Sequence, residues 1–432
     1  MQLVAYGAQD IYLTGNPQIT YFKVVYRRHT NFAMESIEQT FNGTVALGRR
    51  VTATISRNGD LIKDMWLEAT FTNAGNANAV YGLGNALVKQ AEIEIGGQLI
   101  DRQYGEWMNI WTELTVPEGK RVGYDVMVGN VSTANFFDGN DFIGTRNRPR
   151  ETIDVPLQFW FNRNPGLALP LIALQYHEVK LNLELEGAGA TGLGLGVDMT
   201  ECKLFVDYLY LDTDERRRFA QVSHEYLIEQ VQFTGDESIN GTSKKLNLNL
   251  NHPVKALYFV SQSEAGVRGG TASQPCRFQA LGFDNCKLQL NGHDRFVERR
   301  EDYFLNVQTY KHHTHMPRSN RGTCLSTNII RPQVLSTPVN NAAPILTYNP
   351  NVSEITTNVA NELNAQFIYM YSFSLNPEEH QPSGTCNFSR IDNAILQLSN
   401  MTAGLTGVIK VFAVNYNVLR IMSGMGGLAY SN

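Results

Sequence analysis

The chain has 432 residues, a formal net charge of −5 and a hydrophobic content of 43%. This length favours two or three domains, and the apolar content is sufficient for their cores. The acidic balance gives no electrostatic footprint for nucleic acid, so we expect no nucleic acid contact. Charged residues make up only 18%, below the usual quarter, which suggests that part of the surface faces protein in an assembly.

The sequence shows neither a signal peptide nor a membrane-spanning segment. Residues 1–20 lack the basic and apolar regions of a signal peptide, and no run of about 18 apolar residues indicates a membrane span. Five cysteines without a CxxC spacing indicate isolated thiols in a reducing compartment. We therefore predict synthesis in the cytoplasm. The predicted thiols are Cys202, Cys276, Cys286, Cys324 and Cys386.

Short segments of alternating apolar and polar residues run along the whole chain. This period of two is typical of antiparallel strands with one face on a core, and long helical periodicity is missing. Asn or Gly, which tolerate positive φ, indicate turns at 58–60, 96–97 and 291–292. The pattern predicts an all-β sandwich or barrel in each half. The predicted strands are 51–56, 91–95, 179–185, 203–211, 246–250, 287–290, 367–373, 395–398 and 408–419.

One three-part pattern occurs twice in the same order. Its first two parts, at 37–39 and 93–98, reappear at 228–230 and 288–293. The third is a proline 16 residues before a strand leucine, once from Pro165 to Leu181 and once from Pro382 to Leu398. The distance between copies grows along the chain, as loop insertions would produce. A repeat of about half the chain is too long for a solenoid, so it predicts a duplicated domain.

The repeat suggests a division of the chain. We predict an arm at 1–26, a first domain at 27–211, a charged connector at 212–223 and a second domain at 224–432. Within the second domain, 423–427 is predicted to be flexible because of its glycines. Three stretches are too long for tight turns, and the last of them is predicted to be an ordered surface excursion. They are 116–150, 261–280 and 312–364.

Motifs that carry chemistry are weak in this chain. The GxGxxG match at 187–192 follows a strand but lacks the helix that a dinucleotide site needs. His312, His313 and His315 form a cluster with no carboxylate nearby in the sequence, which is weak for a metal site. Four glutamates occupy strand faces opposite the apolar residues, which indicates a solvated or interface face and not a glycosidase cleft. They are Glu92, Glu94, Glu184 and Glu186.

We therefore predict no enzyme activity and no catalytic, cofactor-binding or metal-binding residues. Two alternatives stay open. One is a sugar-binding or sugar-cleaving sandwich that uses Trp107 and Trp111, spaced for one face of a short, half-exposed helix, whereas Trp160 fits a core. The other is a two-domain metalloenzyme. Six Asn-x-Ser/Thr triplets occur, and the possible glycan sites are Asn130, Asn240 and Asn351.

Long literal segments carry a family resemblance. They include 3–20, 25–32, 165–181, 224–235 and 415–430, and they span the chain from end to end. These segments resemble the major capsid proteins of large icosahedral double-stranded DNA viruses, with the strongest likeness to the chlorella viruses. Differences lie in the loops, since 312–364 is longer and 261–280 shorter than that likeness suggests. Loop properties are therefore not transferred from the family.

The resemblance implies a fold and an assembly. The fold would be a double jelly roll, with two tandem eight-stranded sandwiches and long surface loops. The assembly would be a homotrimeric, pseudo-hexagonal capsomer that tiles an icosahedral virion shell around an internal membrane. Implied partners are further copies of the chain and minor capsid proteins beneath the shell. Two copies in each of three chains give six similar units, so the outline is nearly hexagonal. We expect 312–364 to form an outward tower or trimer clasp and 1–26 to face inward.

Overall fold

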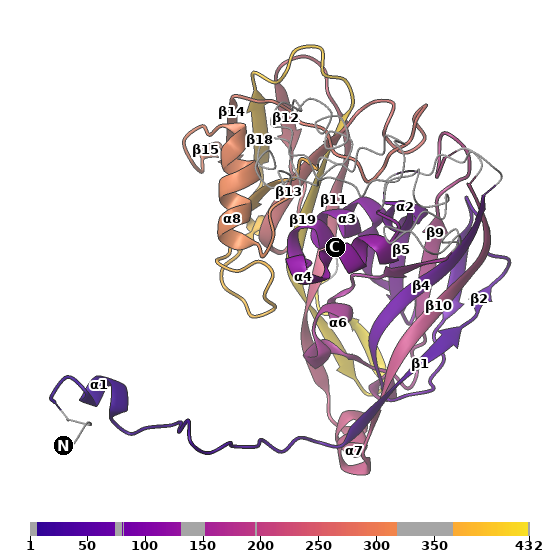
Figure 1. Cartoon of the computed structure of the whole chain (residues 1–432), viewed down its shortest axis with the longest axis vertical. Helices are drawn as coiled ribbons and strands as arrows, with labels where there is room; N and C mark the ends of the chain where they lie inside the picture. Colours follow the sequence, from indigo (N-terminus) through magenta and orange to yellow (C-terminus); the bar gives the residue numbers. More distant parts are fainter. Residues whose placement is uncertain are drawn as a thin grey trace, which may run out of the picture.

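Two β-sandwiches lie side by side in the computed structural model (Figure 1). The structure describes residues 7–73, 80, 82–130, 152–194, 197–317 and 366–430. The first sandwich has one sheet in the order β1-β10-β4-β7, with β8 beside β4, and a second in the order β2-β3-β9-β5-β6. Its strands are β1 (Phe32–Gln39), β2 (Phe41–Asn42), β3 (Arg50–Thr54), β4 (Leu61–Asn73), β5 (Val88–Ile95), β6 (Gln98–Tyr104), β7 (Thr152–Pro156), β8 (Leu169–Pro170), β9 (Val179–Leu185) and β10 (Val197–Leu211).

The second sandwich repeats this arrangement. One sheet has the order β11-β19-β13-β16, with β17 beside β13 and β20 beside β19, and the other has the order β12-β18-β14-β15. All strand pairs inside the four sheets are antiparallel. The strands are β11 (His224–Ser238), β12 (Lys244–Asn247), β13 (Pro253–Gln262), β14 (Asn285–Leu290), β15 (His293–Asp294), β16 (Tyr369–Ser372), β17 (Cys386–Asn387), β18 (Ala394–Ser399), β19 (Val408–Met422) and β20 (Met425–Leu428).

The two strand orders are the same when the strands are numbered within each sandwich. The sheet β1-β10-β4-β7 corresponds to β11-β19-β13-β16, and β3-β9-β5-β6 corresponds to β12-β18-β14-β15. Each sandwich therefore contains eight equivalent strands in two four-stranded sheets, with the first and last strands paired, which is the jelly-roll order. The predicted double jelly roll is confirmed, and the sequence repeat at 37–39 and 228–230 lies on the equivalent strands β1 and β11.

Tight turns follow the predicted chemistry in two of three places. Gly96 and Gly97 join β5 to β6 with φ of 59° and 83°, and Asn291 and Gly292 join β14 to β15 with φ of 50° and 80°. Positive φ at both central residues matches the right-handed twist of a hairpin. The hairpin prediction at 58–60 is wrong, because β3 and β4 belong to different sheets. Gly59 is required there by space, since a Cβ would lie 2.6 Å from Cβ of Tyr208.

Helices occupy parts of the stretches 116–150 and 212–223. The long stretch 116–150 contains α4 (Glu118–Met127), directly after α3 (Gly105–Thr115). In the connector, α7 (Thr213–Gln221) starts at Asp212, whose side chain accepts a hydrogen bond from the backbone N–H of Asp214. The prediction of a flexible 423–427 is also wrong, because β20 pairs with β19 there. The remaining helices are α1 (Ile11–Thr14), α2 (Leu83–Leu87), α6 (Trp160–Arg163), η1 (Pro165–Leu167), η2 (Leu171–Ala173), η3 (Tyr303–Val307), α8 (Gln308–His312) and η5 (Phe388–Arg390).

The N-terminal segment before β1 extends away from both sandwiches (Figure 1). From Ile11 to Tyr26 it carries exposed apolar side chains, among them Tyr12 at 91% and Phe22 at 99% exposure. Such a row of exposed aromatic groups is unusual for a free surface and indicates a binding segment. Within the described parts of the chain, no helix is long and apolar enough to cross a membrane.

Candidate functional site

The interface between the two sandwiches is built around α3. This helix follows β6 in the first sandwich and lies on the outer face of the sheet β11-β19-β13-β16. Trp107 is fully buried, with its ring centroid 5.2 Å from that of Tyr258 and 5.8 Å from that of Phe412. Ile110, Trp111 and Leu114 join the same apolar cluster. Burial of several large side chains at this contact stabilises the sandwiches as one unit.

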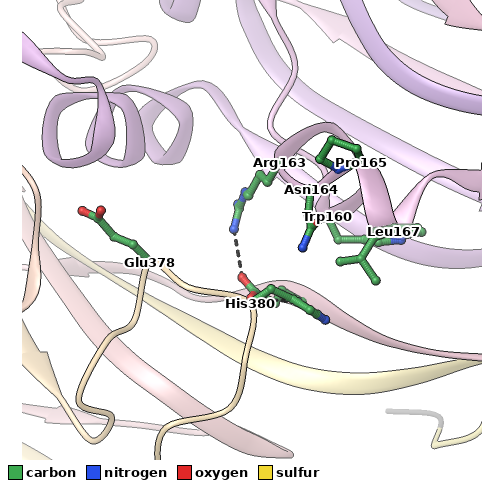
Figure 2. Close-up of a pocket in the computed structure, with 8 residues that line it drawn as sticks. Trp160, Arg163, Asn164, Pro165, Leu167, Glu378 and His380 are labelled. Carbon is green, nitrogen blue, oxygen red and sulfur yellow. Dashed lines mark hydrogen bonds and ion pairs between the residues drawn. The ribbon is translucent and has the colours of Figure 1, made fainter. Parts of the chain in front are cut away.

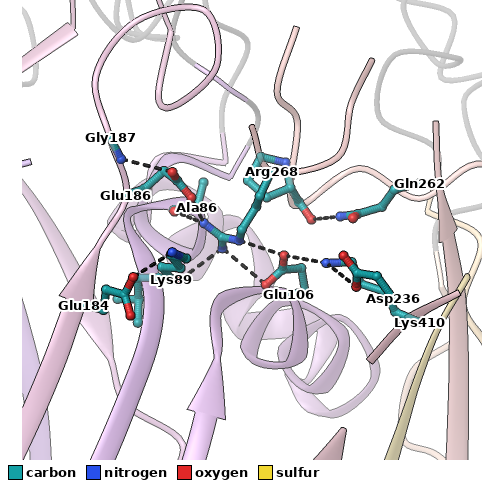
Figure 3. A network of polar contacts seen from close by, with 12 residues as sticks. Ala86, Lys89, Glu106, Glu184, Glu186, Gly187, Asp236, Gln262, Arg268 and Lys410 are labelled. Atoms are coloured by element: carbon teal, nitrogen blue, oxygen red, sulfur yellow. Dashed lines mark hydrogen bonds and ion pairs between the residues drawn. The ribbon is translucent and has the colours of Figure 1, made fainter. Parts of the chain in front are cut away.

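A charged network connects the two sandwiches beside α3 (Figure 3). Arg268 Nε donates to Oε1 of Glu106 at 2.7 Å, and its Nη1 atom is paired with Glu186. Lys410 Nζ lies 3.3 Å from Oε1 of Glu106 and 3.2 Å from Oδ1 of Asp236. Burial raises the pKa of Glu106, but Arg268 and Lys410 outweigh it and bring this pKa to about 2. Glu106 in the first sandwich is thus ionised and held by two cations from the second.

A second network surrounds Glu229 on β11 and includes Arg163 and His380, which Figure 2 labels. Its carboxylate is 2.8 Å from Nζ of Lys255, 3.2 Å from Nη1 of Arg163 and 3.4 Å from Nδ1 of His380. The Arg163 guanidinium also lies 4.2 Å from the ring centroid of Trp111. Burial raises the pKa of Glu229, but His380, Lys255 and Arg163 outweigh it, so this pKa lies below its ordinary value.

The Glu229 network borders a cavity of about 140 Å³ between the sandwiches. Arg163 comes from α6 in the first sandwich, and Glu229 and His380 come from the second. Arg163 and His380, which face the cavity, both contact the Glu229 carboxylate, and the other carboxylate of the lining, Glu378, contacts His313. The arrangement therefore links two domains electrostatically and leaves no activated acid, base or nucleophile pointing into the cavity from this network. The cavity is lined by Trp160, Arg163, Asn164, Pro165, Leu167, Glu229, Glu378 and His380.

Asp101 on β6 lies where the first sandwich meets β11. Its Oδ1 atom accepts a hydrogen bond of 3.1 Å from the backbone N–H of Val231, and Gln103 donates to Oδ2 at 2.7 Å. Beside it, the side-chain amide of Gln230 donates to the carbonyl of Ile100. Burial raises the pKa of Asp101 to about 6, although these hydrogen bonds and Arg163 partly oppose that effect. The contact is therefore sensitive to pH in the range from 4 to 6.

The four glutamates of the strand faces each have a polar partner. Glu92 is buried and paired with Arg50 at 2.5 Å and with Arg102 at 2.7 Å. Glu186 is paired with Arg268, as described above. The other two also have partners, since Lys89 Nζ lies 2.6 Å from Glu184 Oε1 and Asn182 donates to Glu94 at 2.6 Å. These contacts hold the four carboxylates apart from one another, and of the four it is Glu186 that contacts a residue of the second sandwich.

The histidine cluster has carboxylate neighbours that the sequence did not reveal. Nδ1 of His313 lies 2.6 Å from Oε1 of Glu378, and Nε2 of His315 lies 2.7 Å from Oε2 of Glu118. Nε2 of His313 is occupied by the hydroxyl of Tyr258 at 3.1 Å. Across the described ranges, no group of three His, Cys, Asp or Glu side chains is placed to hold a metal ion. The loop at 187–192 leads into a further strand, as expected.

The tryptophans do not form a sugar-binding face. Trp107 and Trp111 do lie on a helix, but the expectation that they are half-exposed is wrong, because α3 is covered by the second sandwich. Trp160 is buried, as expected for a core residue. Because these three rings are buried, they offer no exposed aromatic surface to a sugar, which argues against the sugar-binding alternative.

The candidate glycan sites differ in exposure. The side chain of Asn240 lies exposed in the connection before β12. Asn130 is only 7% exposed, and its amide donates to Oδ1 of Asp125 at 3.2 Å. Asn351 lies outside the described residues, as does most of the excursion 312–364. An N-glycan needs an accessible side-chain amide, so the geometry favours Asn240 over Asn130.

The interface charges were missed by sequence reasoning because their partners are distant in sequence. Arg268 and Glu106, for example, are 162 residues apart. One local signal was present. Lys255 and Lys410 each interrupt a strongly apolar strand, in Pro253–Gln262 and Val408–Met422. A lysine inside such a strand needs a buried partner, which points to an interface on the outer face of that sheet.

Comparison with known proteins agrees with this architecture. A family model for the N-terminus of major capsid proteins matches residues 20–212, and a model for the major capsid protein of large eukaryotic DNA viruses matches residues 215–325 and 357–427. The major capsid protein of Pyramimonas orientalis virus is 52% identical, covering 100% of this chain and 99% of that protein. That of Paramecium bursaria Chlorella virus 1 is 40% identical with the same coverage.

Solved structures give the same result. The quasi-atomic model of the PBCV-1 virus capsid matches with a TM-score of 0.72 and 35% identity, covering 96% of this chain and 100% of that chain. The Faustovirus major capsid protein, at 12% identity, has a TM-score of 0.65 and covers 96% and 94% of the two chains, which shows a shared fold. The chain belongs to the major capsid proteins of large eukaryotic DNA viruses, which are structural proteins of the virion capsid and not enzymes.

Proposed function

We propose that three copies of this chain form a pseudo-hexagonal capsomer, and that these capsomers tile an icosahedral shell. The observation that carries the proposal is the duplication of one strand order within a single, firmly joined unit. Two equivalent sandwiches in each of three chains present six similar edges, so one trimer can contact six neighbours in a sheet. The likeness to the PBCV-1 capsid supports this arrangement.

Mass in solution tests the proposal. Light scattering on the purified protein is expected to give three times 48.4 kDa, and negative-stain images at high concentration are expected to show hexagonal arrays. Contacts within the trimer are expected to be large and apolar, above about 2,000 Å². Contacts between trimers are expected to be smaller and more polar. A monomer at all concentrations would contradict the proposal.

The N-terminal segment, the cysteines and the long loop suggest further partners and the place of synthesis. The exposed aromatic residues of 11–26 suit contact with minor capsid proteins beneath the shell, and through them an indirect link to the internal membrane. Synthesis in the host cytoplasm fits the free thiols at Cys202, Cys276, Cys286 and Cys386. The role of 312–364 as a tower or clasp stays a prediction, because 318–364 lies outside the described residues.

We also propose N-glycosylation of the chain. Of the three candidate residues, Asn240 has the exposure that a glycan requires, Asn130 has little, and Asn351 remains a candidate from sequence alone. Mass spectrometry of peptides from protein made in host cells would identify modified asparagines, and unmodified peptides covering all three positions would contradict the proposal.

A further inference from the structure

A pair of basic residues lies where the N-terminal arm meets the first sandwich. Arg27 and Arg28 are both exposed and stand shortly before β1 begins at Phe32. In the described part of the chain, residues 23–30 belong to no helix or strand and make no backbone–backbone hydrogen bond. The segment leaves the body of the molecule here (Figure 1). Its backbone is therefore open on both edges, which is the state that an endopeptidase needs, because it binds a substrate as an extended strand.

The sequence has five other sites with adjacent basic residues, and regular structure holds the backbone of each of them. This difference singles out the pair in the arm, although all six sites share the same short motif. The five sites are 49–50 at the start of β3, 120–121 in α4, 216–218 in α7, 244–245 in β12 and 299–300 opposite β14.

Exposure of the side chains does not distinguish these sites, whereas backbone pairing does. The three arginines of α7 are as exposed as the pair in the arm, but the carbonyl of Arg218 accepts a hydrogen bond of 3.1 Å from the N–H of Val222. The pair at 299–300 is exposed as well, and the backbone of Arg299 bonds to that of Cys286 in both directions, at 2.8 and 3.0 Å. An endopeptidase has to open such hydrogen bonds before it can bind, and this opening costs free energy.

A cut at the arm leaves the body of the molecule complete. β1 pairs with β10 from Phe32 onward, so the first hydrogen-bonded strand begins after the basic pair. The apolar side chains between Ile11 and Tyr26 are exposed, and none of them belongs to the described apolar clusters of the sandwiches. Hydrolysis after Arg28 therefore breaks the chain outside the fold.

We propose that Arg27-Arg28 is a processing site for an endopeptidase specific for paired basic residues. One water molecule is consumed as the amide bond between Arg28 and His29 breaks. Its oxygen enters the new carboxylate of Arg28, and its two hydrogens pass to the nitrogen of His29, which becomes an ammonium group. The product 29–432 keeps both sandwiches, and the arm 1–28 is released. Because the arm is the proposed contact with inner-layer proteins, the cut separates that contact from the shell, and this consequence rests on the proposed function.

The order of cuts in the native protein tests the site. The full-length protein is incubated with a limiting amount of a kexin-type endopeptidase, which cuts after Arg-Arg and Lys-Arg pairs, and mass spectrometry follows each product. The first cut is expected after Arg28, at least about 10-fold faster than at any other site with adjacent basic residues, because cleavage follows the population of open backbone. A first cut at 216–218 or 299–300 would overturn the assignment.

Two exposed arginines provide matched variants. Arg28→Gln removes the pair in the arm and is expected to abolish the early cut. Arg217→Gln removes the adjacent pairs in α7 and is expected to leave the cut after Arg28 unchanged. Synthetic peptides of residues 21–34 and 211–224 are both expected to be cut, because neither holds the tertiary structure. An uncut 211–224 peptide would show that local sequence, and not the folded backbone, selects the site, which contradicts the proposal.

The cut product tests whether the fold survives. Light scattering and thermal unfolding are expected to give the same number of chains and nearly the same midpoint before and after the cut. Unfolding of the product 29–432 would show that the arm belongs to the structural unit and would overturn the proposal. If the uncut protein is a monomer, the proposed trimer fails, while the order of the cuts still decides whether Arg27-Arg28 is the processing site.

Discussion

Arg268 illustrates how single residues join the two sandwiches. Its guanidinium contacts the carboxylates of Glu106 and Glu186 and the backbone carbonyls of Ala86 and Val88. A planar group with five N–H donors satisfies several acceptors at once, which a lysine could not do. Because such a group is costly to bury without partners, it specifies one relative position of the domains.

Asp101 supplies a prediction about pH. Its pKa in the folded chain is about 6, above the ordinary 3.8, so folding becomes less favourable as pH rises from 4 to 6 and stays so above 6. Asp101→Asn is expected to be more stable than the natural sequence at pH 7 by up to about 3 kcal/mol, with the difference disappearing near pH 4. The buried, unpartnered Oε1 of Gln103 can accept from the new amide after a flip.

Thermal unfolding of both proteins between pH 4 and 8, at one protein concentration, measures this difference. Asp198→Asn, at an exposed position of β10, is the control and is expected to leave the pH profile unchanged. Parallel profiles for the natural sequence and Asp101→Asn over the whole range would contradict the pKa shift that burial produces at Asp101.

At the scale of elements, α3 is the main connection between domains. Met108 reaches the core of its own sandwich, and Trp107 reaches the sheet of the other. The polar residues Glu106, Asn109 and Glu113 of this helix are buried as well, and they contact Arg268, the carbonyl of Cys276 and Arg121. The stability of the helix comes mainly from this packing and not from its intrinsic propensity.

Trp107→Ala tests the contribution of this helix. Truncating a fully buried tryptophan leaves a cavity and removes contacts with Tyr258 and Phe412, so we expect a loss of about 3–5 kcal/mol in the free energy of unfolding. Urea unfolding is also expected to separate into two transitions, one per sandwich. Tyr176→Ala, at an exposed ring, is expected to change stability by less than about 0.5 kcal/mol. A single unshifted transition for Trp107→Ala would contradict the assigned role of α3.

The same elements show what the sequence can and cannot predict. Strands such as β9 and hairpin turns such as Asn291-Gly292 were predicted, because alternation and positive φ are properties of neighbouring residues. The repeat predicted two equivalent domains, and the family resemblance supplied the jelly-roll order. The burial of α3 and the pairing of His313 with Glu378 were missed, because both depend on residues brought together only by the tertiary fold.

At the scale of the whole molecule, the arm before β1 is separate from the structural unit. Its exposed side chains, such as Tyr21 and Phe22, contribute little to the cores of the sandwiches. Deletion of residues 1–26 is therefore expected to leave the mass of the trimer and its thermal midpoint nearly unchanged. Particles assembled from the shortened chain are expected to lack inner-layer proteins, as measured by their protein composition. Particles with all inner components intact would contradict this role of the arm.

The position of β19 has a consequence for biosynthesis. This strand lies between β11 and β13 and pairs with both, although it is made about 150 residues after them. On the ribosome, the first sandwich can close once β10 has emerged, whereas the second must wait for residues beyond 408. Until then the tryptophans of α3 have no sheet to cover them. A polypeptide that stops before residue 408 therefore lacks the strand that joins β11 to β13 and leaves an apolar helix face exposed, so we expect it to aggregate readily.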